Sequence, residues 1–244
     1  MPLLYISLAL VGMVVAYILF LVICALAVDP KREYTRHNSF YRAVLDSVTA
    51  IGIKIMRIRV HVSGEEKLPV GALPLFVCNH RSNFDPIITW YALKKWKLAF
   101  ISKPSNFKIP VFGRLIRRCC FLPIDRENPR NAIRTIQTAA GILADGDLSV
   151  AVYPEGTRNR QPGLLPFHNG VYKIAQKAGA PIVVLTVSGT EKIHKNYPLY
   201  SSHVYLDIVH CIPAQEVCST KTDLLGQQIR NLMEKSLQER ENLR

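Results

Sequence analysis

Residues 75 to 86 read Leu-Phe-Val-Cys-Asn-His-Arg-Ser-Asn-Phe-Asp-Pro, and this stretch decides how the chain folds. Four consecutive apolar residues at its start predict a short buried strand. Asp85 suits an N-cap and Pro86 suits the first helical position, so a helix is expected to begin there. The stretch therefore predicts a strand, a turn that carries His80, and a helix.

The same alternation of strand and helix continues through most of the chain. Helical patterns fall between the apolar runs; one is preceded by Asn128-Pro129 and another ends at Gly179. This order predicts an α/β fold, with a mixed, largely parallel sheet of about seven strands flanked by helices. The expected strands are 58–62, 75–78, 98–102, 121–124, 148–153, 182–187 and 204–209.

His80 and Asp85 are the first candidates for chemistry. On a continuous helix, an offset of five residues places two side chains about 140° apart, so a bend is needed to bring them together. The Asp85-Pro86 helix start supplies that bend, and His80 can then fold back over Asp85. Taken alone the pair is a weak signal, because Asp before Pro is most often only a cap.

Two further blocks strengthen the prediction. Residues 150–158 read Val-Ala-Val-Tyr-Pro-Glu-Gly-Thr-Arg, and residues 121–126 read Phe-Leu-Pro-Ile-Asp-Arg. Each is an apolar strand that runs into polar residues. Three such strand ends are expected to meet at one edge of an α/β sheet, where ligands usually bind.

The His-x4-Asp block and the Pro-Glu-Gly-Thr-Arg block, in this order, resemble the glycerolipid acyltransferases, most closely the 1-acyl-sn-glycerol-3-phosphate acyltransferases. The similarity runs from about Val60 to Val187. It implies acyl transfer from a thioester to the sn-2 hydroxyl of 1-acyl-sn-glycerol-3-phosphate (lysophosphatidic acid), which forms phosphatidic acid for phospholipid biosynthesis. It also implies acyl-CoA or acyl-carrier protein as the donor, with no cofactor and no metal ion.

For this reaction His80 is the expected general base, because imidazole is suited to taking a hydroxyl proton at neutral pH. Asp85 is expected to orient the ring and to stabilise the imidazolium. The sequence contains no Gly-x-Ser-x-Gly elbow, so a covalent acyl-enzyme is not expected. Cys78 is interpreted as a buried packing residue.

The resemblance also implies a phosphate site, since guanidinium groups and turn amides suit a phosphate monoester. Glu155 is expected to brace Arg126 or Arg158, or to hold the turn. Val184 stands where the family often has proline and His168 where lysine is common; both departures bear on substrate fit. The predicted substrate-binding residues are Lys103, Arg126, Glu155, Gly156, Thr157 and Arg158.

The chain is basic, with a formal net charge of +13 and a pI near 9.6. Eleven lysines and arginines lie between Lys94 and Arg134, mixed with apolar residues, which suits an anionic lipid surface. Nucleic acid is not expected as a partner, because no zinc-finger or helix-turn-helix signature occurs. The six cysteines form no Cys-x2-Cys pair, so a reducing, cytosolic location is expected.

Residues 1–28 carry no charged side chain. Residues 3–28 as a helix would extend roughly 39 Å, enough to cross a hydrocarbon core of about 30 Å. A cleaved signal peptide is the alternative, but the basic n-region is missing. Basic residues follow at once and are expected to stay on the cytoplasmic side of the cell membrane: Lys31, Arg32, Arg36 and Arg42.

A second helix, expected over 34–56, has apolar residues at helical spacing and is interpreted as lying at the membrane interface. The predicted division is 1–57 for the membrane anchor and interfacial helix and 58–244 for the acyltransferase domain. Whether the first helix spans the bilayer or dips into one leaflet stays open at this stage.

Three alternatives also remain. The first is a related acyltransferase that uses glycerol-3-phosphate or another lysophospholipid. The second is a non-catalytic protein that binds anionic lipid. The third is a thioesterase or lipase, which the missing serine elbow disfavours.

Overall fold

The computed structural model describes residues 1–125 and 128–242. Seven strands form one sheet in the order β1-β7-β6-β2-β5-β3-β4, which confirms the predicted mixed α/β sheet. The strands are β1 (Ile58–Ser63), β2 (Leu75–Cys78), β3 (Ala99–Ser102), β4 (Leu122–Pro123), β5 (Val150–Val152), β6 (Ile182–Ser188) and β7 (Ser202–Ile212).

Five neighbouring strands, β6, β2, β5, β3 and β4, run parallel. β7 is antiparallel to β6, and β1 is parallel to β7. The carboxyl ends of the five parallel strands therefore share one edge of the sheet with the first residues of β1 and β7. This shared edge is called the catalytic edge below, because β2 leads there into His80.

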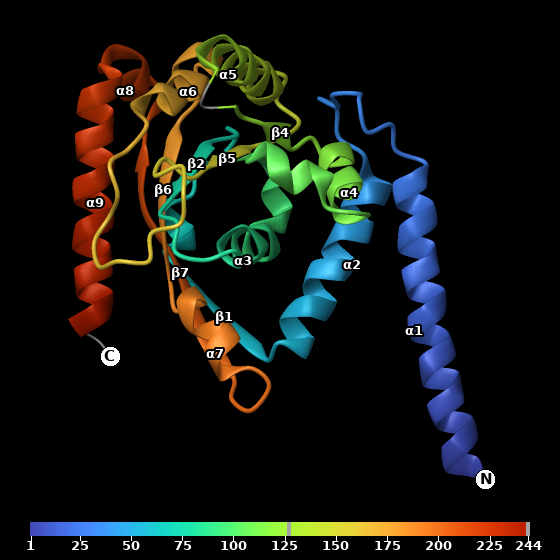
Figure 1. Cartoon of the computed structure of the whole chain (residues 1–244). Coiled ribbons are helices and arrows are strands. Elements are labelled where there is room, and N and C mark those ends of the chain that lie inside the picture. The colour runs from blue at the N-terminus through green and yellow to red at the C-terminus, as the bar shows by residue number, and fades with distance from the viewer. Residues whose placement is uncertain (126–127, 243–244) are drawn as a thin grey trace.

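Helices cover both faces of the sheet (Figure 1). Successive β2 side chains point to opposite faces. Leu75 and Val77 join the core that contains residues of α5, α6 and α9, whereas Phe76 and Cys78 join the core beneath α2, α3 and α4. The helices are α1 (Pro2–Leu26), α2 (Ser39–Ile55), α3 (Asp85–Ala92), α4 (Phe112–Arg118), α5 (Pro129–Ala144), α6 (Lys173–Ala178), α7 (Ile193–Asn196), α8 (Ala214–Ser219) and α9 (Thr222–Asn242).

Several predicted boundaries follow local capping. α5 begins after Asn128, whose side-chain oxygen accepts hydrogen bonds from the backbone N–H groups of Arg130 and Asn131. Gly179 ends α6 in the left-handed conformation, at φ 62°. The second helix is shorter than the predicted 34–56, because Asn38 caps it and its first helical residue is Ser39.

Helix α1 is apolar along its whole length and, within the described residues, is the one helix long and apolar enough to cross a membrane. Only its last part packs on the rest of the protein. Cys24 and Ala25 are buried, and the Tyr17 hydroxyl lies 2.8 Å from the Ser47 hydroxyl of α2. The N-terminal part of α1 extends away from the other elements (Figure 1).

Candidate active site

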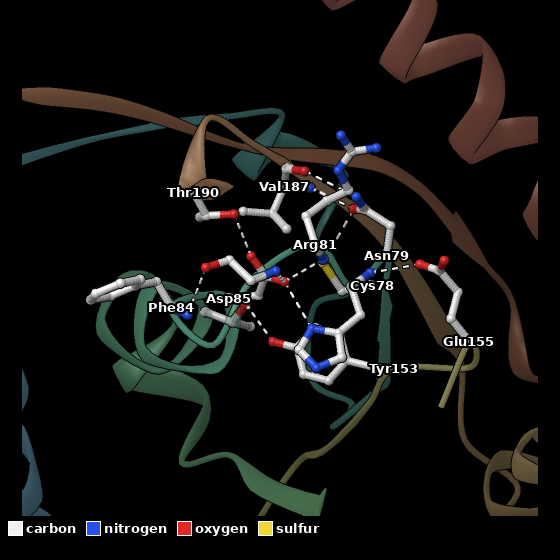
Figure 2. Close-up of polar contacts among 12 residues, drawn as sticks. Cys78, Asn79, Arg81, Phe84, Asp85, Tyr153, Glu155, Val187 and Thr190 are labelled. Atoms are coloured by element: carbon white, nitrogen blue, oxygen red, sulfur yellow. Dashed lines mark hydrogen bonds and ion pairs between the residues drawn. The ribbon is translucent and has the colours of Figure 1, made fainter. Parts of the chain in front are cut away.

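His80 lies in the turn after β2 and meets Asp85, the first residue of α3. Figure 2 shows Asp85 and the residues around it. His80 Nδ1 lies 2.8 Å from Asp85 Oδ2, and the Asp85 side chain is fully buried. The predicted fold-back of the histidine over the carboxylate is thus present. A carboxylate accepts hydrogen bonds, so Nδ1 carries the proton and the other nitrogen, Nε2, is left as an acceptor.

Asp85 is not the N-cap that the sequence predicted. Phe84 holds the N-cap position and Asp85 is the first residue of α3. A capping carboxylate turns forward to the amides of its own helix. Asp85 instead turns back, and its Oδ2 accepts the N–H groups of Arg81 and Ser82 at 2.6 and 2.7 Å. The histidine and the turn amides outcompete the helix amides for this carboxylate.

Thr190 completes the surroundings of Asp85 and was not predicted from the sequence. It follows β6, and its Oγ1 donates a hydrogen bond to Asp85 Oδ1 at 2.5 Å. The chain reaches this position through Gly189, at φ 90°, where a Cβ atom would come within 2.4 Å of the His203 carbonyl oxygen. Only knowledge that β6 lies beside β2 could have pointed to Thr190, and sequence order does not give that.

A second unpredicted contact fixes the same junction. The Asn79 side chain is buried and bridges to Val187 of β6: Oδ1 accepts the Val187 N–H at 2.7 Å, and Nδ2 donates to its carbonyl at 3.0 Å. A buried amide that hydrogen-bonds through both its oxygen and its nitrogen favours one arrangement of the elements around it. The start of the His80 turn is thereby locked to β6.

Tyr153 supports the ring of His80. The two rings are stacked with centroids 4.5 Å apart, and the Tyr153 hydroxyl lies 3.1 Å from the Thr89 hydroxyl. Burial raises the pKa of Tyr153 well above its ordinary value, so the phenol stays neutral beneath the histidine. Packing on one face and Asp85 at the edge together fix the ring orientation.

Glu155 holds the turn, which is one of the roles predicted for it. Its Oε1 accepts the backbone N–H of His80 at 2.7 Å and its Oε2 accepts the backbone N–H of Leu165 at 2.9 Å. Burial raises the pKa of this carboxyl, and the two backbone hydrogen bonds oppose that rise. The carboxylate therefore ties the block after β5 to the block after β2.

A cavity of about 1090 Å³ opens beside the dyad, and His80 is one of its lining residues. A volume of this order suits a ligand of lipid size. Its lining includes four of the predicted substrate-binding residues: Lys103, Gly156, Thr157 and Arg158. Many apolar side chains also line it: Phe100, Ile101, Ile109, Phe112, Ile116, Phe121, Ile124, Ile133 and Ile136.

The cavity brings together four of the six predicted substrate-binding residues, and Glu155 is not in its lining. Lys103 and Arg158 are exposed side chains that line the cavity, and they come from the segments that follow β3 and β5. Arg126 lies outside the described residues. His168, one of the two family departures, also lines the cavity, whereas Val184 is fully buried in β6.

Cys78 is the nearest thiol to the dyad along the chain, and it is only 2% exposed. Burial raises its pKa well above the ordinary value, with the Asp85 carboxylate adding to the rise. A thiol in that state is not a nucleophile at neutral pH. The interpretation of Cys78 as a packing residue agrees with this environment.

A histidine–aspartate dyad at a sheet edge, beside a cavity lined by cationic and apolar side chains, suits acyl transfer to a charged lipid. Residues 59–188 match the model of the acyltransferase family, and the chain belongs to this family. The family membership that the sequence motifs indicated is confirmed.

Relatives come from bacteria and plants. A 1-acyl-sn-glycerol-3-phosphate acyltransferase of Escherichia coli (strain K12) is 31% identical over 166 residues, which cover 68% of this chain and 67% of that protein. The Haemophilus influenzae protein of the same name is 36% identical over 50% of this chain and 51% of its own length. A chloroplastic one from Brassica napus is 33% identical over 73% and 51%. The chain spans about half the length of the last two relatives.

A solved structure shares the fold. It is the crystal structure of the 1-acyl-sn-glycerophosphate (LPA) acyltransferase PlsC from Thermotoga maritima, with a TM-score of 0.70 and 22% sequence identity. The match covers 98% of this chain and 94% of that one, so it extends over the N-terminal helices as well as the sheet.

Proposed function

We propose that this protein transfers an acyl group from an acyl thioester to the sn-2 hydroxyl of 1-acyl-sn-glycerol-3-phosphate and so forms phosphatidic acid. The observation that carries the proposal is the His80–Asp85 dyad beside a cavity whose lining contains both cationic and apolar side chains. An acceptor with a phosphate and an acyl chain matches both kinds of lining.

In this mechanism His80 Nε2 takes the proton of the acceptor hydroxyl as the oxygen attacks the thioester carbonyl carbon. The new ester C–O bond forms, the C–S bond breaks, and the thiolate leaves with the proton that His80 had accepted. Asp85 holds Nδ1–H and stabilises the imidazolium between the two transfers. General base catalysis of this kind contributes typically 10² to 10⁴ in rate.

The acceptor phosphate is assigned to the polar lining residues of the cavity that the sequence predicted. Arg158 and Lys103 supply positive charge there, and the turn at Gly156 and Thr157 supplies backbone N–H groups. Arg126 is assigned to the same site from its place in the sequence. Glu155 acts on this site indirectly, because it fixes the turn that presents Gly156.

The acyl chain is assigned to the apolar lining residues of the cavity, which are mainly phenylalanine and isoleucine side chains. Acyl-CoA and acyl-carrier protein are the proposed donors. The substrate thioester is sufficient to drive the transfer, so the proposed reaction uses no cofactor.

Residues 1–57 are proposed to anchor residues 58–244 to the cell membrane, with the catalytic domain on the cytoplasmic face. α1 is exposed and apolar, and its most apolar window is only 11% buried within the protein. Basic residues follow α1 directly, which favours a cytoplasmic position for the rest of the chain.

The test is a panel of donors and acceptors with purified protein in detergent. Lysophosphatidic acid should be acylated in preference to glycerol-3-phosphate and lysophosphatidylcholine. Arg158→Ala should raise the acceptor KM about tenfold or more and leave kcat nearly unchanged, because a charged hydrogen bond to phosphate is worth about 1.5 to 3 kcal/mol.

Arg160→Ala is the matched control. Arg160 is exposed and lies two residues further on, and it is not among the residues that line the cavity. Its substitution should leave both constants unchanged. An unchanged acceptor KM in Arg158→Ala would remove Arg158 from the phosphate site.

A further inference from the structure

An exposed apolar turn lies between α7 and β7. Three of its four residues have large exposed side chains: Tyr197 at 40%, Leu199 at 73% and Tyr200 at 69%. This segment is called the 197–200 turn. Scattered apolar residues on a surface are ordinary, but a contiguous group of them marks an interaction site.

Backbone hydrogen bonds hold the turn in a defined shape. Arg57 Nη1 donates to the carbonyl oxygens of Pro198 and Leu199 at 3.1 and 3.0 Å. The Tyr200 N–H donates to the Asn196 carbonyl at 2.7 Å. The exposed apolar side chains therefore stand on an anchored backbone, and the arginine ties the turn to the junction between α2 and β1.

The turn lies at the catalytic edge. The turn belongs to the connection between β6 and β7. That connection carries Thr190, which is hydrogen-bonded to Asp85, and leads into Ser202, the first residue of β7. α2 ends at the same edge, just before β1, with Ile51 and Ile55 exposed at 42% and 58%. Figure 1 shows the loop after α7 and the last turn of α2 at the same end of the molecule, toward which the N-terminus of α1 also points.

The two segments that carry these apolar residues are rich in positive charge. Glu191 is the acidic residue in the two segments 51–59 and 190–200, and its carboxylate accepts the N–H of Gly189 at 3.1 Å. The exposed cations in the same segments are Lys54, Arg57, Arg59, Lys192 and Lys195. Exposed apolar side chains in segments that also carry exposed cations fit the interfacial region of an anionic bilayer.

We propose that the 197–200 turn, together with Ile51 and Ile55, inserts into the headgroup region of an anionic phospholipid bilayer and sets the catalytic edge against the lipid. This second membrane contact rests on the proposed function, in which the acceptor is a lipid. The exposed cations of these two segments and the direction of α1 favour lipid over a second copy of the chain. Membrane contact at two separate points fixes the orientation of the site, which a single helix cannot do.

The direct test measures contact without using activity. In the full chain, Cys211 and Cys218, the two cysteines that are not buried, are first replaced by serine. Leu199→Cys is then labelled with an environment-sensitive fluorophore in vesicles of phosphatidylcholine and phosphatidylglycerol that contain a headgroup-level nitroxide lipid. We expect the label at position 199 to be quenched as strongly as one placed in α1 by Val11→Cys.

Val70→Cys is the matched negative control. Val70 is fully exposed, and it precedes β2 at the far end of the sheet, where Leu75 pairs with Ile182 and Ile182 pairs with Ile212. Its label should remain unquenched. If position 199 behaves like position 70, the proposal is overturned, whether or not the α1 label is quenched.

A paired activity measurement separates this contact from catalysis. The double variant Leu199→Asp, Tyr200→Asp should retain wild-type turnover in detergent micelles and lose about tenfold on anionic vesicles. Equal turnover on vesicles would overturn the proposal. So would shielding of position 199 that depends on protein concentration and occurs without lipid, because that result would identify a second copy of the chain as the occupant.

Discussion

Asp85 accepts four hydrogen bonds, and its two oxygens have different partners. Oδ2 accepts hydrogen bonds from His80 and two turn amides, whereas Oδ1 accepts one from Thr190. A carboxylate held on both oxygens cannot rotate away from the imidazole. Thr190, in the segment that follows β6, is therefore a positioning residue that acts through Asp85.

Thr190→Val tests this role, because valine keeps the shape of threonine and removes the hydroxyl. The buried Oδ1 would lose its donor, at a cost of about 1 to 3 kcal/mol. We expect kcat to fall roughly five- to 100-fold with little change in the acceptor KM, since the lost interaction matters only when His80 carries charge.

Thr190→Ser is the control and should recover most of the rate. A purely structural role for Thr190 predicts a different pattern, in which both variants lose thermal stability and the folded fraction keeps wild-type kcat. Steady-state kinetics together with thermal unfolding in detergent distinguishes the two patterns.

At the scale of elements, the site depends on turns that the sheet brings together. Glu155 links the turn after β5 to the turn after β2 through two backbone amides. Its pKa is raised by burial from an ordinary value of 4.5, so the folded protein binds this proton more tightly than the unfolded chain does. The contribution of Glu155 to stability is therefore fully present below its ordinary pKa and is lost as pH rises through the folded pKa.

Glu155→Gln should remove that part of the pH dependence. The free energy of unfolding of the wild type should decline as pH rises from 4.5, and the variant should show a flatter curve over the same interval. The variant should also be less active, because glutamine offers one acceptor oxygen to two amides. Glu66→Gln, at an exposed position, should change neither property; a wild-type slope in Glu155→Gln would contradict the prediction.

The sequence predicted the helices and strands better than the long-range contacts between them. Apolar runs located all seven strands, and Asn128 and Gly179 marked helix ends, because these signals act over a few residues. Thr190 and Asn79 depend on β6 lying beside β2, more than a hundred residues away along the chain. Asp85 was predicted as a cap because the local rule is sound, and a tertiary contact overrode it.

At the scale of the whole molecule, the packing of α1 limits how it meets a bilayer. Residues from Tyr17 onward contact α2 and α4, so only residues 2–16 extend freely. Fifteen helical residues reach about 22 Å, less than a hydrocarbon core of about 30 Å. With the catalytic domain at the surface, we predict that these residues of α1 dip into the bilayer and do not cross it.

Leu4→Cys tests this position of α1. In sealed vesicles the thiol should be protected from a membrane-impermeant reagent added on either side, and it should react once detergent is present. Glu66→Cys, on the exposed surface of the catalytic domain, should react on the side that carries the domain. Reaction of position 4 from the opposite side would show that α1 spans the bilayer.

The claim on which the function depends is that His80, oriented by Asp85, removes the proton from the acceptor hydroxyl. The most direct measurement is the rate of phosphatidic acid formation from lysophosphatidic acid and an acyl thioester by His80→Ala protein, with circular dichroism showing that it is folded and His210→Ala as the control for an exposed histidine. We predict a fall of about 10² to 10⁴ for His80→Ala and a wild-type rate for His210→Ala. Folded His80→Ala protein that works at the wild-type rate would contradict the claim.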